Sequence, residues 1–500
     1  MNNALINSLI SLIQNTYLIF ALCLIVAYAI LAFVSVLETR HYLKKTNFID
    51  FSDVLSSHLA PSISIITPAY NEEKTIIESV RSLLSLHYSN YDVLIINDGS
   101  KDKTVETVIE AYDMEQVNYV VNPIIKTEKI RGVYKSKNRA FHNLILVDKE
   151  NGGKADAINC GINLSEADLI SCIDADCILE PNALVKMVKP FMENTKRRVV
   201  AAGGVIRAAN NCRIEDGKVV DVDLPKSYIG RVQILEYIRA FLLGRMAWSR
   251  LNGLLIISGA FGLFDRRLAQ ELGGYDTKTV GEDMEFVVRL RRYLHEKKIK
   301  YRVSYIPDQL CWTQVPESYR ILRNQRNRWT RGTAETLWMH REIFFNPKYK
   351  ILGILSFPFW LVFEWLAPIV EITGILVFIF LAYMGRVDWF FFLSLLLAVL
   401  VISTLYSLFS ILSEEITFHQ YRKKGSLRKL SITAVLEPLF FHPYITVSAI
   451  MGNLDLLFGN KKGWGTMERT TFNEPTEPVD NPKRKIKKSR KAKIQQIKKG

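Results

Sequence analysis

Leu169-Ile170-Ser171-Cys172-Ile173-Asp174-Ala175-Asp176 is the stretch that decides the fold. Its first five residues form a short apolar run, typical of a buried strand, and two aspartates follow with one residue between them. Two carboxylates at the end of a buried strand are costly unless a positive charge lies beside them. In a strand the pair would share one face, and in a turn both can still point at one cation. The alternative interpretation, two aspartates of a solvated turn, stays open at this point.

Other segments repeat the alternation of strand and helix around this stretch. Short apolar runs at 62–67, 93–97 and 199–206 predict strands, and the spacing of apolar residues over 72–86 predicts a helix. Such alternation predicts an α/β domain over residues 61–340, with a mostly parallel sheet and helices on both faces. Ligands of such sheets bind beyond the carboxyl ends of the strands, which is where the polar motifs of this chain fall.

Apolar stretches on both sides of the domain predict membrane helices. Residues 17–37 carry no charge and are long enough to cross a hydrocarbon core of about 30 Å. Basic residues follow them, so residues 1–45 are expected to be a retained anchor whose C-terminal side is cytoplasmic. Residues 345–458 contain two further candidate spans, at 351–384 and 389–412.

The segments after these spans are expected to stay at the cytoplasmic side. Glu437, Pro438 and His442 interrupt the apolar run 430–458, which predicts that it lies in the membrane interface, although four spans remain an alternative. Residues 459–500 are expected to be a cytoplasmic loop and a basic tail. Within this loop, the glycines around Trp464 in segment 463–469 are typical of a gating loop or of an ordinary surface loop.

The composition describes a folded chain with reduced cysteines. The 500 residues are 49% hydrophobic and 23% charged, which excludes a disordered or fibrous protein. Six cysteines are scattered without a CxxC pair, so neither a disulfide framework nor a zinc site is expected. The formal net charge is +15, but ten Lys or Arg and no acid lie in residues 481–500. This tail is expected to dock on anionic lipid, and no motif indicates a nucleic-acid partner.

Two polar loops follow the first two predicted strands. Thr67, Tyr70 and Glu72 belong to the first loop, and Asp98 begins the second. One interpretation is structural, with Asn71 capping a helix and Asp98 starting a turn. The other is that both loops line a ligand site. Neither a GxxxxGK[ST] nor a GxGxxG motif follows the first strand, so a P-loop or a dinucleotide site is not supported.

Four later motifs complete the set of candidate residues. Gly152-Gly153-Lys154 precedes a helical run and offers an ammonium and backbone donors to a diphosphate, or is a plain helix start. The small residues around Gly259 would let a bulky ligand approach the backbone. Asp283 is a candidate general base or a helix cap. Gln325-Arg326-Asn327-Arg328-Trp329 lies in an Arg-rich segment whose simplest interpretation is an amphipathic helix that holds lipid headgroups.

Taken in this order, the motifs resemble those of family 2 glycosyltransferases with the GT-A fold. Asp98, Asp174-Ala175-Asp176, Glu282-Asp283 and 325–329 match the D, DxD, ED and QxxRW elements of the membrane-embedded branch, which includes cellulose synthase, hyaluronan synthase and bacterial poly-N-acetylglucosamine synthase. The resemblance runs from about residue 62 to residue 338 and extends to the flanking membrane segments. This chain departs from the pattern in Gly281, where several relatives have Thr, and in a long insertion at 122–150 that could alter the acceptor route.

The resemblance implies a role for each matching residue. Four would line the uridine pocket of a UDP-sugar donor: Thr67, Tyr70, Glu72 and Asp98. Three would lie near its diphosphate: Lys154, Gln325 and Arg328. Asp174 would contact the ribose or the metal, Asp176 would hold Mg²⁺ or Mn²⁺, and Asp283 would take the proton from the acceptor hydroxyl. Trp329 and Gly259 would bind the acceptor sugar.

These roles imply an inverting glycosyltransferase of the cell membrane, multi-pass and with a cytoplasmic catalytic domain. One base without a second carboxylate nucleophile favours a single in-line displacement, which converts an α-linked donor into a β-linked product. The main hypothesis is processive growth of a polysaccharide coupled to its export, in which Glu364 and Glu371, about two turns apart, line a polar path or face the interface. The alternatives are transfer of one sugar to a membrane lipid acceptor and a non-enzymatic sensor of nucleotide sugars.

Overall fold

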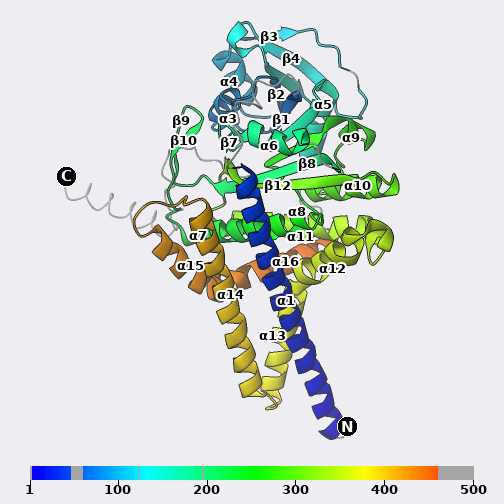
Figure 1. Ribbon diagram of the computed structural model, residues 1–500, viewed down its shortest axis with the longest axis vertical. Coiled ribbons are helices and arrows are strands. Elements are labelled where there is room, and N and C mark those ends of the chain that lie inside the picture. The colour runs from blue at the N-terminus through cyan, green and yellow to red at the C-terminus, as the bar shows by residue number, and fades with distance from the viewer. Residues whose placement is uncertain (1–2, 47–59, 122, 194–195, 460–500) are drawn as a thin grey trace, which may run out of the picture.

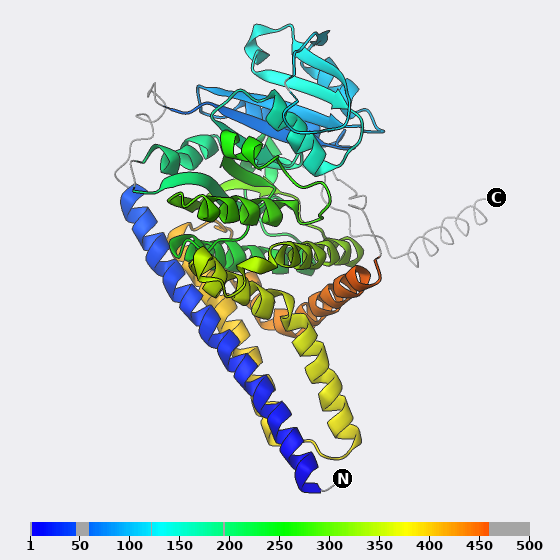
Figure 2. The same ribbon diagram turned by 90° about the vertical axis from the view of Figure 1, so that its right-hand side faces the viewer.

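The computed structural model describes residues 3–46, 60–121, 123–193 and 196–459. An α/β domain forms one end of the molecule, a layer of helices lies beneath it, and three long helices project from that layer on the opposite side (Figures 1 and 2). The segment 463–469, considered as a gating loop, and the basic tail lie outside the described residues.

A ten-stranded sheet is the core of the α/β domain. Its strand order is β3-β4-β5-β2-β1-β6-β11-β8-β12-β7. Four neighbouring strands at its centre are parallel: β5 (Leu144–Lys149), β2 (Tyr91–Asp98), β1 (Ile63–Ala69) and β6 (Leu169–Ile173). The other strands are β3 (Met114–Val117), β4 (Ile130–Ser136), β7 (Cys177–Leu179), β8 (Arg198–Ala208), β11 (Phe261–Asp265) and β12 (Tyr301–Thr313), with a separate hairpin of β9 (Arg213–Glu215) and β10 (Lys218–Asp221). This arrangement confirms the predicted α/β fold.

Helices cover both faces of the central strands. Ile65 and Ile66 are consecutive in β1 and therefore point to opposite faces, yet neither side is exposed to solvent. The helices of this domain are α3 (Ile76–Leu84), α4 (Thr104–Ala111), α5 (Lys154–Leu164), α6 (Ala183–Met192), α9 (Arg266–Glu271) and α10 (Glu282–Glu296). Burial on both faces explains why these strands read as continuous apolar runs in the sequence.

The segment 122–150, interpreted from the sequence as an insertion, supplies β4 and β5, and β5 pairs with β2 from Val93 opposite Leu144 onward. One local expectation is wrong. Asn71 does not cap a helix, since α3 begins only after Thr75. Asn71 instead has a left-handed backbone (φ 57°), and its side-chain oxygen accepts a hydrogen bond from the backbone N–H of Lys101 at 2.8 Å.

A layer of helices lies between the sheet and the projecting helices (Figure 2). It contains α7 (Tyr228–Tyr237), which continues through the π-helix η2 (Ile238–Arg245) into α8 (Met246–Arg250), together with α11 (Tyr319–Met339), α15 (Ser426–Phe440) and α16 (His442–Leu457). The projecting helices are α1 (Asn3–Thr46), α13 (Ala367–Tyr383) and α14 (Trp389–Thr417). Short helical elements complete the chain: η1 (Arg139–Phe141), η3 (Arg341–Ile343), η4 (Pro347–Tyr349), η5 (Leu352–Ser356), α12 (Phe357–Phe359) and η6 (Trp360–Trp365).

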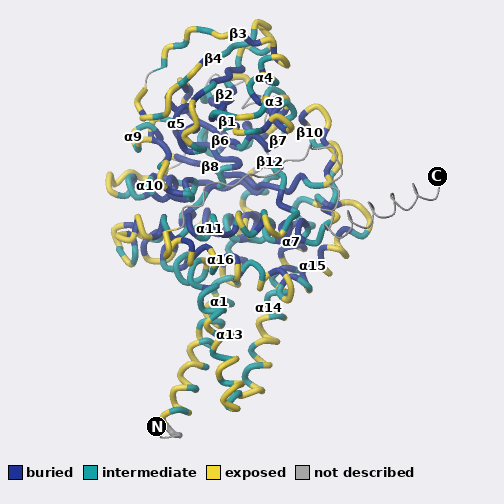
Figure 3. Tube along the Cα trace, turned by 180° about the vertical axis from the view of Figure 1, so that it is seen from behind, coloured by how far each residue is buried: buried dark blue, intermediate teal, exposed yellow. Residues whose placement is uncertain are grey.

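Two of the projecting helices, α1 and α14, have the length and composition of membrane spans, and α13 has them only together with the helical segment before it. Within the described residues, α1 and α14 each qualify alone, and two bent helix pairs raise the number of candidates to four. The pairs are Leu352–Trp365 with Ala367–Tyr383, bent by 41°, and Ser426–Phe440 with His442–Leu457, bent by 49°. Figure 3 shows that the projecting parts are mostly exposed or half-buried, and side chains such as Phe380 and Leu397 present apolar surface there.

The bend before α13 separates the two glutamates that the sequence places on one helical face. Glu364 lies before the bend, where the Tyr28 hydroxyl of α1 donates to it at 3.1 Å. Glu371 lies after the bend and contacts His442 at 3.1 Å and Thr446 at 2.7 Å, both on α16. The assumption of one shared face is therefore wrong, because each glutamate faces a different neighbouring helix.

One buried and two partly exposed ion pairs fasten the projecting helices α1 and α14 to the domain. Glu414 of α14 accepts hydrogen bonds from Arg207 of β8 and from Gln309 of β12, each at 3.1 Å, and both members of the ion pair are almost fully buried. Glu38 of α1 likewise accepts from Arg250 at 2.9 Å and from Arg302 at 3.2 Å. Each of these glutamates on a projecting helix is thus neutralised by an arginine of the α/β domain or of the helix layer beneath it.

We expect Glu414→Gln to lower the free energy of unfolding by about 3–5 kcal/mol, because it leaves the buried Arg207 without its counter-charge. Lys45→Gln is the matched control, since its pair with Glu193 is partly exposed and such pairs contribute about 0–1 kcal/mol. Denaturant unfolding of both variants in the same detergent measures the difference. Equal stability of the two variants would contradict the structural role of the Arg207–Glu414 pair.

Candidate active site

The candidate site lies beyond the carboxyl ends of the parallel strands. Asp98 ends β2, and Asp174 and Asp176 lie in the turn between β6 and β7. Two helices begin at the same place: α5 begins at Lys154, after Gly153 with φ 90°, and α10 begins at Glu282. The predicted helix start at Lys154 is confirmed, and the topology brings motifs from distant parts of the sequence to one edge of the sheet.

Lys154 is the cation of a cluster of carboxylates, which we call the carboxylate cluster (Asp174, Glu282 and Asp283). The Lys154 ammonium lies 2.6 Å from Asp174 and 3.9 Å from Glu282, and its side chain is largely buried. Burial would lower the pKa of Lys154, but the charges of Asp174, Asp283 and Glu282 outweigh this effect and raise it. Lys154 is therefore held in its charged form.

Asp283 lies in the first turn of α10, and it is not the helix cap, because Gly281 occupies that position. The backbone N–H of Gly259 donates to Asp283 Oδ2 at 2.7 Å, and Oδ1 is buried without a hydrogen-bond partner among the described residues. Burial raises the pKa of Asp283, Lys154 opposes this shift, and the charge of Asp174 adds to it. One carboxylate oxygen is thus oriented, and the other remains able to accept a proton.

Two glycines give the carboxylate cluster its close packing. A Cβ at Gly259 would overlap the Asp283 carboxylate, so the loop before β11 approaches α10 only without a side chain. A Cβ at Gly281 would come within 2.6 Å of the backbone of Gly332 in α11. The start of α10 therefore lies directly against α11, the helix that carries Arg328.

Glu282 is buried beside the proposed base. Burial and the adjacent Asp283 raise the pKa of Glu282 to about 7, while Lys154 and Arg328 act in the opposite direction. Arg328 also acts to lower the pKa of Asp283. Lys154, Asp283 and Arg328 thus act on one another in this structure, together with Glu282, a second carboxyl group whose protonation depends on its neighbour.

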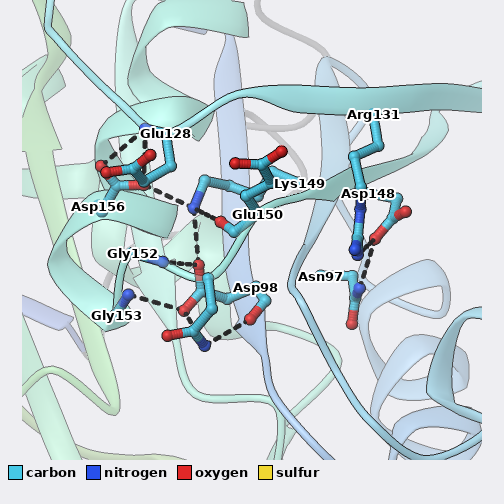
Figure 4. A network of polar contacts seen from close by, with 11 residues as sticks. Asn97, Asp98, Glu128, Arg131, Asp148, Lys149, Glu150, Gly152, Gly153 and Asp156 are labelled. Carbon is cyan, nitrogen blue, oxygen red and sulfur yellow. Dashed lines mark hydrogen bonds and ion pairs between the residues drawn. The ribbon is translucent and has the colours of Figure 1, made fainter.

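Asp98 is fixed by four internal donors (Figure 4). Its carboxylate accepts hydrogen bonds from the Lys149 ammonium at 2.7 Å and the Asn151 amide at 3.1 Å, and from the backbone N–H groups of Gly152 at 3.0 Å and Gly153 at 2.8 Å. A carboxylate offers about four acceptor positions, so these donors occupy its capacity. In this structure, Asp98 shapes the loop that leads into Lys154.

Lys149 is a buried residue that the sequence does not single out. Its ammonium lies between Asp98 and Asp156, at 2.7 Å and 2.6 Å, and it has no exposed surface. Burial would lower the pKa of Lys149, but these two carboxylates raise it. The signal that would have found it is its position at the end of β5, a strand that the sequence analysis placed inside an insertion.

The other residues expected at the uridine lie in β1, which contains Thr67, and in the loop after it, which contains Tyr70 and Glu72. Thr67 is fully buried, and its hydroxyl has no hydrogen-bond partner among the described residues. Glu72 is also buried and accepts a hydrogen bond from the Thr75 hydroxyl at 2.6 Å. Tyr70, in contrast, is 42% exposed, which leaves its ring free to cover a ligand.

Helix α11 carries the residues expected at the diphosphate and the acceptor. The side-chain oxygen of Gln325 is buried without a partner among the described residues. Trp329 is 41% exposed, and the guanidinium of Arg326 lies over its ring at 4.1 Å. Arg326 is itself fixed by Glu236 of α7 at 2.7 Å, a pair that sequence reasoning missed because the two residues are far apart in the chain.

Asp174 and Asp176 have the chemistry of a site for Mg²⁺ or Mn²⁺ that substrate phosphates complete. Both supply oxygen ligands, which these ions prefer, and Asp176 is almost fully buried. The described residues contain no group of three or more His, Cys, Asp or Glu that could hold a metal ion alone. A cavity of about 430 Å³ lies elsewhere, lined by Asn159, Glu285 and Arg289 among others, and none of the predicted site residues lines it.

Comparison with known proteins identifies relatives of the chain. A family model described as glycosyltransferase like family 2 matches residues 60–332. The poly-β-1,6-N-acetyl-D-glucosamine synthase of Staphylococcus aureus (strain COL) is 31% identical over 353 residues, covering 70% of this chain and 69% of that protein. The enzyme of the same name from Staphylococcus epidermidis (strain RP62A) is 29% identical over 318 residues, covering 63% of this chain and 64% of that protein, slightly under two thirds of its length.

A solved structure shares the fold. The mannosyltransferase PcManGT from Pyrobaculum calidifontis, in complex with GDP-Man and Mn²⁺, matches with a TM-score of 0.51 and 17% sequence identity. The match covers 88% of this chain and 99% of that one. At this identity the likeness concerns the fold alone, and it agrees with the predicted GT-A architecture.

We expect the rate of nucleotide release to fall as the pH is lowered, because Asp283 accepts a proton only when ionised and burial raises its pKa above the usual range of an aspartate. Glu282→Gln removes a negative charge next to Asp283, which lowers the pKa of Asp283 and moves the acid limb to lower pH. The pH dependence of kcat/KM measures this shift. Glu342→Gln, at an exposed pair with Arg292, is the control, and an unmoved limb in Glu282→Gln would contradict the assignment.

Proposed function

The chain belongs to the glycosyltransferase family 2 proteins, and on that premise we propose that it adds N-acetylhexosamine units from a UDP-sugar to a growing β-linked polysaccharide. The observation that carries the proposal is the carboxylate cluster, in which Lys154 lies 2.6 Å from Asp174 while Gly259 orients Asp283. The names of the staphylococcal relatives support an N-acetylhexosamine as the transferred unit and a polysaccharide as the product.

The residues of the cluster divide the chemistry of glycosyl transfer. Negative charge builds up on the oxygens of the departing diphosphate, and stabilising this charge is the largest electrostatic contribution to catalysis. Lys154 and Arg328 supply the positive charge for it. Asp283 accepts the proton of the acceptor hydroxyl through its unpaired oxygen, and this help contributes roughly 10²- to 10⁴-fold to the rate. The acceptor oxygen bonds to the anomeric carbon as the bond to UDP breaks, so the configuration inverts. Mg²⁺ or Mn²⁺, held by Asp174 and Asp176, would further neutralise charge on the diphosphate.

Trp329 is proposed as the platform for the acceptor sugar. Its ring is partly exposed, and Arg326, fixed by Glu236, holds it from one side at 4.1 Å. An aromatic ring offers an apolar face on which a sugar ring packs. Because α11 carries both Arg328 and Trp329, the diphosphate and the acceptor would be positioned by the same helix.

A line of polar residues supports coupling to export, in a multi-pass protein with a cytoplasmic catalytic domain. We call it the polar seam, and it consists of Glu236, Arg239, Glu437, His442 and Glu371. Arg239 contacts Glu437 through two hydrogen bonds of 2.8 Å and 3.0 Å, and His442 contacts Glu371 of α13 at 3.1 Å. Polar groups inside an apolar bundle mark a path for a polar molecule. The seam begins at Glu236, which also holds Arg326 beside Trp329.

We expect purified protein in nanodiscs with Mn²⁺ to release UDP from UDP-N-acetylglucosamine and to form a polymer, measured as UDP release and product size. Asp176→Asn and Asp283→Asn should each abolish polymer formation. Trp329→Ala should keep slow donor hydrolysis but lose transfer, whereas Trp338→Ala, an exposed tryptophan of the same helix, should not change either rate. Release of UDP with a product of one sugar on lipid would replace the polymerase proposal, and no release from any UDP-sugar would end it.

We also expect Glu371→Ala to reduce the fraction of polymer that reaches the lumen of proteoliposomes, while UDP release in detergent stays near that of the unmodified protein. The reason is that this variant removes the seam's acceptor on α13 for His442 and Thr446. Thr373→Ala is the matched control, because Thr373 lies on the same helix and contacts Tyr17 of α1 instead. An unchanged lumenal fraction in Glu371→Ala would exclude the seam as the path.

A further inference from the structure

Lys154 forms an ion pair with Asp174, one of the two carboxylates that a divalent cation would use. Its ammonium lies 2.6 Å from Asp174 Oδ1, the distance of a strong charge-assisted hydrogen bond. The Lys154 side chain is 12% exposed and that of Asp174 is 31% exposed, so solvent screens the pair only in part. The ammonium and a divalent ion therefore require the same oxygen.

The position of Lys154 is set by the surrounding fold. It is the first residue of α5, and the preceding backbone is fixed because the N–H groups of Gly152 and Gly153 donate to Asp98. Gly153 has φ 90°, a conformation that a residue with a side chain rarely adopts. The base of the lysine side chain is thus anchored, and its four-carbon stem lets the ammonium move between nearby anions.

Three carboxylates of the protein act on the Lys154 ammonium. Asp174 is the nearest, Glu282 lies 3.9 Å away, and Asp283 also acts on its charge. A diphosphate bound beside α5 would add a further anion within reach of the same ammonium, because the start of a helix favours phosphate. Removing one partner of a buried ion pair is strongly unfavourable, whereas exchanging that partner for another anion is not.

We propose that Lys154 and the divalent cation compete for Asp174, so that the cation binds tightly only when a nucleotide diphosphate takes over the Lys154 ammonium. The exchange balances charge locally. The Lys154 ammonium moves from the Asp174 carboxylate to a phosphate oxygen, and the divalent cation then binds Asp174 in place of the ammonium. This inference rests on the proposed function, and it makes metal and donor binding mutually dependent. By linkage, the nucleotide raises the affinity for the cation by the same factor as the cation raises the affinity for the nucleotide.

Lys154 differs in this respect from the other lysine of the site. Lys149 has no exposed surface and is held between Asp98 and Asp156, both within 2.7 Å. It also donates to the carbonyl of Glu150 at 2.6 Å, so its three donors are all used within the protein. Lys149 is a fixed structural cation, whereas Lys154 faces the residues that would hold the ligand.

The test measures Mn²⁺ binding directly, by the electron paramagnetic resonance signal of free Mn²⁺, in full-length protein with and without UDP. In the unmodified protein we expect weak Mn²⁺ binding that UDP strengthens. Lys154→Gln should bind Mn²⁺ roughly tenfold more tightly without UDP, and UDP should strengthen binding much less. Lys154→Arg keeps the charge and should keep the weak binding without UDP. Lys186→Gln on α6, which breaks a pair with Asp308 of β12, is the control for the loss of one lysine.

Three results would overturn the inference: equal Mn²⁺ affinity of the unmodified protein with and without UDP, no gain of UDP-free affinity in Lys154→Gln, or retained binding in Asp174→Asn. The last variant also shows whether the measured ion uses Asp174. Because the readout is metal binding, it is independent of sugar transfer. A protein that shows the expected linkage but transfers no sugar would contradict the proposed function and leave this inference standing.

Discussion

The carboxylate that ends β2 is buried and the one that follows β6 is partly buried, and each is paired with a lysine from the segment that runs from the end of β5 to the start of α5. Lys149 neutralises Asp98, and Lys154 neutralises Asp174, at 2.7 Å and 2.6 Å. Gly152 and Gly153 lie between these two lysines in the sequence, and the backbone N–H groups of both donate to Asp98. One short segment therefore supplies the charge balance for both motifs. The remaining parts of the candidate site, α10 with Asp283 and α11 with Arg328, lie next to this segment.

Much of the fold could be predicted because the central strands are buried on both faces and therefore appear in the sequence as unbroken apolar runs. One of these strands, Leu169–Ile173, has the predicted bounds. The aspartates after that strand and the helix start at Lys154 were readable for the same reason, since polar residues after a buried strand stand out. Strand β5 was missed because its apolar run is short and lies within a segment interpreted as an insertion. Lys149 was missed with it, because its partner Asp98 is 51 residues away in the sequence.

The ion pairs that join distant helices around the site could not be predicted from the sequence either. Glu236 and Arg326 are each unremarkable in their own segments, but their ion pair joins the helix under the sheet to the helix that carries Trp329. Periodicity predicts that a segment is a helix and which face is apolar, and it does not predict which charged residues of two distant helices meet. The positions of Glu364 and Glu371 could not be predicted either, because residue spacing along a straight helix does not apply across a bend of 41°.

The contact between Gly281 and Gly332 limits how this site can vary. Backbone meets backbone there, and a Cβ on Gly281 would come within 2.6 Å of Gly332, so a side chain at 281 requires α11 to move away from the start of α10. A substitution at one of these positions is therefore tolerated only with a compensating displacement of the other helix. The spacing between the start of α10, which carries Asp283, and α11, which carries Trp329, is therefore limited by the absence of a side chain at both contact positions.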